Sequence, residues 1–370
     1  MIKISRPALR PGLVAAFGVV LSLPACGSGA TGASSSAGGS ASAAGGSSGG
    51  AGGTGGELAS SITASSSASG SSSGTGGATG CVVGVDHVIF VGPAGKDAAA
   101  GTEADPFATV SHALAKAVAG DTVFVRDGVY NELVTFPGSG AVGAPITLRA
   151  YCGEHPVLDA TGLGSGTAQP ALVSLVDRSH LVVDGFELRN LTGTGSSFPA
   201  GIWVRGSVCD VVIRNNDVHH ITAPGGGGKD TGAHGIAVYG EKTTPSEDVH
   251  LEGNLLHDLV LGPSEAMVVN GNVRKLEVLG NTVHDVNNIA FDFIGFEPDV
   301  CASCSQADVT DVDNVNRARD GLVRGNTAFN MTTATRPAYG GVVGANGAPQ
   351  DLDIDGEPRK GHFDIGADER

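Results

Sequence analysis

Three ionisable residues stand at related places in a short repeated segment of the sequence. The repeated segment has six residues of the form Gly/Ala-apolar-x-apolar-x-Gly. His234 and Glu265 each directly precede such a segment, and Asp292 lies inside one. A histidine and two carboxylates can accept and donate the protons of acid–base catalysis. Carboxylate oxygens are also the ligands that Ca²⁺ prefers. We therefore expect catalytic residues at His234, Glu265 and Asp292, with Glu265 and Asp292 also able to bind Ca²⁺.

Four more residues of the same segments are candidates for binding a substrate. Trp203 and Tyr239 carry rings that can stack on sugars, and Arg205 can neutralise the carboxylate of a uronate. Asn270 occupies the equivalent place one segment further along the chain. Each residue alone could be an ordinary exposed position on a strand. Their gathering around one set of segments favours a binding site.

These segments must be strands that bury one face. Apolar residues fill the second and fourth places of each segment, and this period of two is typical of half-buried strands. The inward set is Ile202, Val204, Ile236, Val238, Met267, Val269, Phe291 and Phe293. The outward columns are then Trp203, Ala237, Val268, Asp292 and Arg205, Tyr239, Asn270, Ile294. Because stacked strands lie about 4.8 Å apart, we expect His234 and Glu265 to be side-chain neighbours.

A second repeat is interleaved with the first. An apolar strand is followed by Gly-Asn or Asn-Asn and then an aliphatic residue at Asn216, Asn254, Asn281 and Asn326, with separations of 38, 27 and 45 residues. Two strands per repeat with loops of variable length predict a solenoid. Asn tolerates left-handed bends, and its amide can bond to the same Asn one coil above. The repeat therefore predicts an all-β parallel β-helix; the dense Leu pattern of leucine-rich repeats is missing.

Histidines recur within this second repeat. His219, His257 and His284 occupy the same place, next to His220, Asp258 and Asp285. Such a series could bind metal, but repetition in register with the coil is what a structural stack predicts. We favour the structural stack.

The beginning of the β-helix carries a family resemblance. Val110, Ala113, Leu114 and Ala117 form the apolar stripe of one amphipathic helix, which would cover the open end of the solenoid. Around it the sequence reads F-V-x-P-x-G-x-D, D-P-F-x-T-V, G-D-T-V-x-V-x-x-G-x-Y-x-E and P-I-T-L-R-A-Y. This pattern resembles pectate-lyase-like right-handed β-helix proteins, over residues 88 to about 335. The resemblance implies a right-handed parallel β-helix and is weakly specific for chemistry.

The resemblance implies a polysaccharide lyase more than a glycoside hydrolase. Ser264-EAMVVNGN is similar to a coil of the chondroitinase-B and alginate-lyase group, where a Glu binds Ca²⁺ and a Lys is the base. Glu265 fits the first role, but Asn270 stands where the Lys is expected. Other basic candidates are Arg205, Lys242 and Lys275. We expect a lyase-like protein acting on extracellular polysaccharide; the alternative is a non-catalytic glycan-binding or adhesive surface protein.

The N-terminus predicts export. A basic start and an apolar run of eleven residues, 13–23, have the form of a signal peptide. Leu-Pro-Ala-Cys26 then resembles a lipobox, so we expect a lipoprotein signal at 1–25, lipidation of Cys26 and anchoring at the outer membrane or cell surface, with plain secretion as the alternative. Residues 26–80, rich in Gly, Ser and Ala, predict a disordered tether. The β-helix follows at 81–335, and 336–370 would close its C-terminal end.

The net charge limits the kinds of molecule that the protein can bind. Three of the 22 Lys and Arg residues precede Cys26, which leaves 19 against 38 Asp and Glu, a net charge of −19. This argues against nucleic acid and anionic membranes, and a polyanionic sugar would need Ca²⁺ as a bridge. We expect a monomer that touches the membrane through its lipid only.

Exported cysteines can pair. Cys301 with Cys304 is the expected disulfide, rather than a metal site. Cys81 with Cys152 is a second candidate, and Cys209 is expected to be free.

Overall fold

The computed structural model describes residues 87–332, except 165, 228–230 and 297–300, and all of these lie in the compact unit Gly70–Arg370. The signal peptide, Cys26, the tether and the closing segment 336–370 lie outside the described residues, as does Cys81. No helix within the described ranges has the length and apolar character needed to cross a membrane.

One sheet runs the length of the solenoid, and we call it face 1. Its strands, in spatial order, are β1 (Val88–Val91), β2 (Thr122–Val125), β5 (Ile146–Ala150), β8 (Leu181–Asp184), β11 (Cys209–Arg214), β14 (Ser246–Glu252) and β16 (Val273–Leu279), followed by β18 (Ala318–Arg319) and β19 (Leu322–Arg324). Each neighbouring pair is parallel, as expected when every coil contributes one strand to the face.

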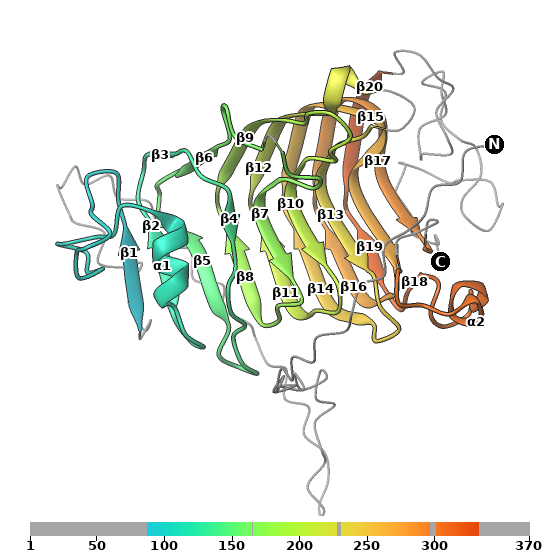
Figure 1. Ribbon diagram of the computed structural model, residues 1–370, viewed down its shortest axis with the longest axis horizontal. Coiled ribbons are helices and arrows are strands. Elements are labelled where there is room, and N and C mark those ends of the chain that lie inside the picture. Colours follow the sequence, from blue (N-terminus) through green and yellow to red (C-terminus); the bar gives the residue numbers. More distant parts are fainter. Residues whose placement is uncertain (1–86, 165, 228–230, 297–300, 333–370) are drawn as a thin grey trace, which may run out of the picture. The chain divides into compact units, whose positions relative to one another are not determined.

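A second sheet is divided into two runs by strands that pass through both. These are β15 (Leu255–Gly271) and β17 (Thr282–Ile294). Face 2 holds their first halves with β3 (Val129–Tyr130), β6 (Val157–Asp159), β9 (Glu187–Thr192), β12 (Asp217–Thr222) and β20 (Thr327–Thr332). Face 3 holds their second halves with β4 (Val134–Thr135), β7 (Ala171–Val176), β10 (Ala200–Arg205) and β13 (His234–Gly240). Figure 1 shows the strands stacked along the solenoid. The predicted parallel β-helix is therefore confirmed.

The core between the faces is apolar and matches the expected inward set. Seven of those eight side chains belong to one buried cluster, and Phe293 packs against it. Phe291 stands opposite Met267, and Phe293 stands opposite Val269, on neighbouring strands. The period-two pattern therefore assigned the buried side of these strands correctly.

Asparagine side chains form a buried ladder at one corner of the solenoid. The Nδ2 of Asn216 donates to Oδ1 of Asn254 (3.1 Å), that of Asn254 to Asn281 (2.9 Å), and that of Asn281 to Asn326 (2.9 Å). The residue before each is left-handed, with φ between 54° and 65°, at Asn215, Gly253, Gly280 and Gly325. Since buried amides must be paired, each Asn fixes the position of the next coil.

The helix that begins the solenoid is α1 (Val110–Lys116). The hydroxyl of Thr109 caps it by accepting from the backbone N–H of His112 (3.2 Å). Val110, Ala113 and Leu114 are buried in the main core. The helix thus covers the apolar interior at the N-terminal end, as the sequence predicts.

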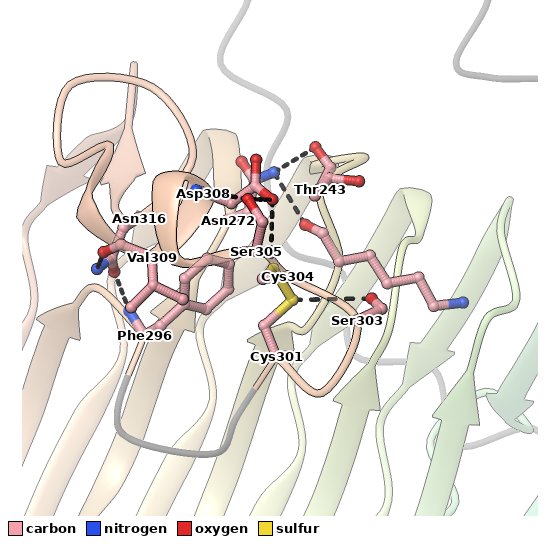
Figure 2. The surroundings of a disulfide bond; sticks show 11 residues. Thr243, Asn272, Phe296, Cys301, Ser303, Cys304, Ser305, Asp308, Val309 and Asn316 are labelled. Carbon is pink, nitrogen blue, oxygen red and sulfur yellow. Dashed lines mark hydrogen bonds between the residues drawn. A yellow bond between two sulfur atoms is a disulfide. The ribbon is translucent and has the colours of Figure 1, made fainter.

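The loop between β17 and β18 contains α2 (Gln306–Thr310) and a disulfide between Cys301 and Cys304. Figure 2 shows this disulfide beside Ser305, whose side chain and that of Asp308 form a capping box. Cys209 was expected to be free, and this is wrong: Cys152 and Cys209 are each disulfide-bonded. The spacing of an odd number of cysteines after Cys26 could not reveal these connections.

Candidate active site

The outward columns predicted from sequence form on face 3. Trp203 stands opposite Ala237, Ala237 opposite Val268, and Val268 opposite Asp292. The next column follows the order Arg205, Tyr239, Asn270 and Ile294. The strands therefore bring the candidate residues from four coils onto one face.

His234 and Glu265 are neighbours at the start of these strands. The Nδ1 of His234 donates to the backbone carbonyl of Glu265 (3.0 Å) and lies 3.7 Å from its Oε2. Because a carbonyl only accepts, Nδ1 carries the proton, and Nε2 is left to accept from the Tyr239 hydroxyl (3.3 Å). Burial lowers the pKa of His234 to about 4, an effect that the Glu265 hydrogen bond opposes. At neutral pH His234 is an uncharged residue that positions Glu265.

The aromatic candidates are buried, which corrects the expectation that they are open to a sugar. Trp203 is 2% exposed, Tyr239 is 9% exposed, and Asn270 is fully buried. The Trp203 ring meets Tyr239 edge to face at 4.9 Å and His234 at 5.3 Å. These rings join a second buried cluster, whose members are Ala171, Ala200, Trp203, Ala237, Tyr239 and Val268. The outward columns are largely apolar and small, so the large rings pack on them instead of projecting into water.

Glu265, Asp292 and Arg205 retain access to solvent. The side chain of Glu265 is 13% exposed and that of Arg205 is 24% exposed, while Asp292 is partly buried. Burial raises the pKa of Asp292, opposed by a hydrogen bond from the backbone of Phe293. A carboxyl with a raised pKa is better matched to proton transfer near neutral pH than an ordinary one. Glu265 and Asp292 lie on neighbouring coils but are not directly opposite each other: Glu265 pairs with Ile289, and Asp292 pairs with Val268. Each carboxylate can bind a hard cation.

The basic candidates each have a carboxylate partner. Arg205 pairs with Glu241 through Nε (3.0 Å) and Nη2. The Nζ of Lys242 lies 2.5 Å from Asp177. Lys275 lies on face 1, 3.5 Å from Glu247. Proton abstraction by any of these would require that its ion pair first opens.

The repeated histidines stack on face 2, as the sequence predicts. His219 and His257 have ring centroids 4.9 Å apart and planes 17° apart, and His257 and His284 have values of 5.1 Å and 8°. The sequence singled out His219 and His257 as possible metal ligands without placing Asp217 beside them, and the group of His250, Glu252 and Glu277 went unrecognised. Extending the Asn-based register to every strand position would have placed both groups together.

The chain is similar in sequence to one described protein family and to two curated proteins. Residues 89–243 match the family described as Pel9A-like, right-handed β-helix region. The uncharacterized protein YwoF of Bacillus subtilis (strain 168) is 36% identical over 210 residues, 56% of this chain and 44% of the relative. Pectate lyase PEL9 of Emericella nidulans is 35% identical over 102 residues, 27% of this chain and 25% of the relative.

A solved structure, the GH136 lacto-N-biosidase from Eubacterium ramulus, is similar with a TM-score of 0.43 and 16% identity, covering 68% of this chain and 53% of that one. The chain spans less than half the length of the two curated relatives. The parallel strands and the matched region together identify the fold as a right-handed parallel β-helix. Residues 89–243 match the Pel9A-like right-handed β-helix region, and the chain folds as a right-handed parallel β-helix.

Proposed function

We propose that this is a carbohydrate-active β-helix protein that cleaves an extracellular, uronate-containing polysaccharide by β-elimination on face 3. Two findings support a polysaccharide substrate: the Pel9A-like region and the relative named as a pectate lyase. The observation that carries the site is the contact between His234 and Glu265, with Asp292 on the next coil. Glu265 stands opposite Ile289, and the raised-pKa carboxyl of Asp292 follows three residues further along that strand, so the two carboxyls lie along the same face.

β-Elimination requires a base that removes the C5 proton of the uronate while the charge of its carboxylate is neutralised. Asp292 takes this proton, because burial makes its carboxylate more basic than an ordinary aspartate. His234 holds Glu265 in place through the hydrogen bond to its carbonyl. Glu265 would hold Ca²⁺, and the ion would neutralise the substrate carboxylate. Loss of the C5 proton to Asp292 then breaks the C4–O4 bond, and the leaving oxygen takes up a proton from water.

The net charge of the protein supports a need for such a cation. After removal of the first 25 residues the chain carries a net charge of −19. A polyanionic sugar is repelled by that field at long range. A divalent cation shared by Glu265 and the substrate offsets this repulsion at the point of contact.

A second function, glycan binding without cleavage, is favoured by the ion pairs of the basic candidates. Arg205, Lys242 and Lys275 each face a carboxylate, and His234 is uncharged and buried. These groups are then parts of a rigid surface and take no part in proton transfer.

The first experiment is a panel of polysaccharides followed in parallel by ultraviolet absorbance and by reducing-end release, with and without EDTA. A lyase produces unsaturated uronates, so absorbance rises and EDTA stops the rise. A hydrolase releases reducing ends without that absorbance, which would overturn the proposed reaction. Binding of a labelled glycan without either signal would favour the second function.

We further propose that the protein is lipid-anchored at Cys26 to the outer membrane or cell surface, with residues 26–80 as a tether. The lipobox-like Leu-Pro-Ala-Cys and the Gly/Ser-rich composition support this location. Cys26→Ala should move the protein from the membrane fraction to the soluble fraction. Retention of the variant in membranes would show that no lipid on Cys26 is needed.

A further inference from the structure

We propose that Asp217, His219 and His257 on face 2 bind a divalent transition-metal ion of the Zn²⁺ class. This site is separate from the glycan site on face 3 and does not depend on it. The oxygen and nitrogen donor atoms of the three side chains lie within 4.8 Å of one another. They come from β12 and β15, which pair in parallel, so the sheet itself holds the ligands together.

The first argument concerns the protons of His257. Its Nδ1 lies 2.7 Å from Oδ2 of Asp258, and its Nε2 lies 3.0 Å from Oδ1 of Asp217. A neutral imidazole carries a single N–H, so it can donate to one of these carboxylates only. When Nδ1 donates to Asp258, the lone pair on Nε2 faces the lone pairs of Asp217. Either a proton or a metal ion between Nε2 and Asp217 removes that repulsion, and the two compete for the same position.

The second argument concerns the role of Asp258. Histidines that bind metals commonly donate their other N–H to a carboxylate, which fixes the ring and its tautomer. Asp258 is in the left-handed region with φ 51°, and this bend brings its carboxylate beside the ring of the preceding residue. His257 therefore already has the outer partner that a metal-binding histidine needs.

His219 supplies the third donor from the coil before His257. Its ring stacks on His257, and its Nε2 lies 3.1 Å from Oε1 of Glu187. Glu187 is also bound by Arg189, with 2.5 Å between Oε1 and Nη1. Because Arg189 already neutralises Glu187, the protein ligands are the two imidazoles and Asp217, and a fourth position is open to water.

Donor type and geometry identify the class of ion. Two imidazoles with one carboxylate suit Zn²⁺ and similar ions, whereas Ca²⁺ and Mg²⁺ prefer oxygen. Bonds of about 2.0–2.1 Å in a tetrahedral site place ligand atoms roughly 3.3 Å apart. Ion binding therefore draws the two rings together by small side-chain rotations. All three side chains are partly exposed, so an ion can reach them.

The chain contains a matched control for this site. His284 continues the same stack and places its Nδ1 2.6 Å from Asp285. The residue that corresponds to Asp217 one coil later is Leu255, so the carboxylate ligand is missing there. His284→Gln removes a stacked ring as His257→Gln does, without removing a proposed ligand.

A competing group lies on face 1. The Nδ1 of His250 is 3.2 Å from Glu277 and 3.5 Å from Glu252. Its side chains are more exposed than the His219 and His257 rings. Both carboxylates that contact His250 belong to this group itself, so neither acts only to orient the ring. His250→Gln therefore reports whether an ion binds at face 1 instead.

The test uses Co²⁺ as a spectroscopic probe and Zn²⁺ as a competitor on the full chain. Visible absorption of tetrahedral Co²⁺ should appear at one equivalent and disappear when Zn²⁺ is added. His257→Gln and Asp217→Asn should weaken binding by more than about 100-fold, and Asp258→Asn by about 10–100-fold. His284→Gln and His250→Gln should bind as the unchanged protein does. The Asp217 side chain is 43% exposed and lies outside the apolar core, so its variant should remain folded, which circular dichroism checks.

Three results would overturn the proposal. Absence of the tetrahedral Co²⁺ spectrum in the unchanged protein would show that the ligands do not converge. An equal loss of Co²⁺ binding in His284→Gln and His257→Gln would show that the histidine stack has a structural role only. Loss of Co²⁺ binding in His250→Gln, with binding retained in His257→Gln, would place the ion on face 1.

Discussion

The indole of Trp203 and the phenol ring of Tyr239 meet edge to face on adjacent strands, with centroids 4.9 Å apart and planes at 87°. Trp203 is the single tryptophan of the chain. Its fluorescence therefore reports on this cluster without contribution from another indole. The guanidinium carbon of Arg205 lies 5.5 Å from the same ring centroid.

The fluorescence of the folded protein should be shifted to the blue and protected from iodide, because the indole is 2% exposed. Tyr239→Ala should increase quenching by opening one side of the indole. The measurement is a Stern–Volmer titration of both proteins, with the urea-unfolded chain as the reference for full access. Quenching of the folded protein at the unfolded rate would mean that Trp203 is open to a sugar after all.

Acid should destabilise the protein through His234. Its pKa is about 4 in the folded state against an ordinary value of 6.5, so below pH 6.5 the unfolded chain takes up a proton that the folded chain refuses. The stabilisation is complete above pH 6.5 and is lost as the pH falls towards 4, by up to about 3 kcal/mol. Urea unfolding between pH 7 and pH 4 measures this loss.

His234→Asn is the control for that experiment, because an amide can still donate to the carbonyl of Glu265 without titrating. Its unfolding free energy should depend less on pH than that of the unchanged protein. Asp292 acts in the opposite sense, since its raised pKa favours folding as the pH falls, and this contribution is common to both proteins. Parallel pH curves would show that His234 is accessible to protons in the folded state.

Glu265→Gln should lower turnover of a cleaved polysaccharide by at least about 100-fold. The substitution removes the charge that we propose binds the cation, and it leaves the backbone carbonyl that accepts from His234. Glu277→Gln, on face 1, is the matched control and should keep full turnover. Initial rates with excess Ca²⁺ separate a defect in ion binding from one in chemistry. Equal rates for the two variants would remove face 3 from the reaction.

Phe291→Ala should lower the free energy of unfolding by about 3–5 kcal/mol, the usual cost of truncating a buried aromatic ring. Phe291 is 4% exposed and belongs to the main core, whereas Phe329, the matched control, is 45% exposed. Phe329→Ala should cost far less, although it removes a ring stacked on His284 at 4.7 Å. Urea unfolding of both variants gives the comparison, and similar losses would reverse the assignment of inward residues.

The sequence predicts the fold well because the repeat carries its own register. Aligning Asn216 with Asn254 places every following residue opposite its partner, and the alternation of Ile236 and Val238 decides which side is buried. Strand pairing, the core and the contact of His234 with Glu265 follow from these two patterns.

Burial of the opposite side does not follow from them. The period of two places Trp203 and Tyr239 away from the main core, but it contains no information on whether those rings meet each other or water. Packing of several coils at once decides that question. The same limit applies to Asp217, which reaches Nε2 of His257 only because two strands 40 residues apart lie in parallel.

The asparagine ladder has a consequence for how this protein can change. Four successive asparagines are linked across 38, 27 and 45 residues, yet the three hydrogen bonds between them remain 2.9–3.1 Å long. Coil spacing is thus independent of the length of chain between rungs. Insertions and deletions in the connecting loops can reshape the outer surface while the pitch stays constant, so grafting a loop from one coil onto another is a practical route to new recognition surfaces.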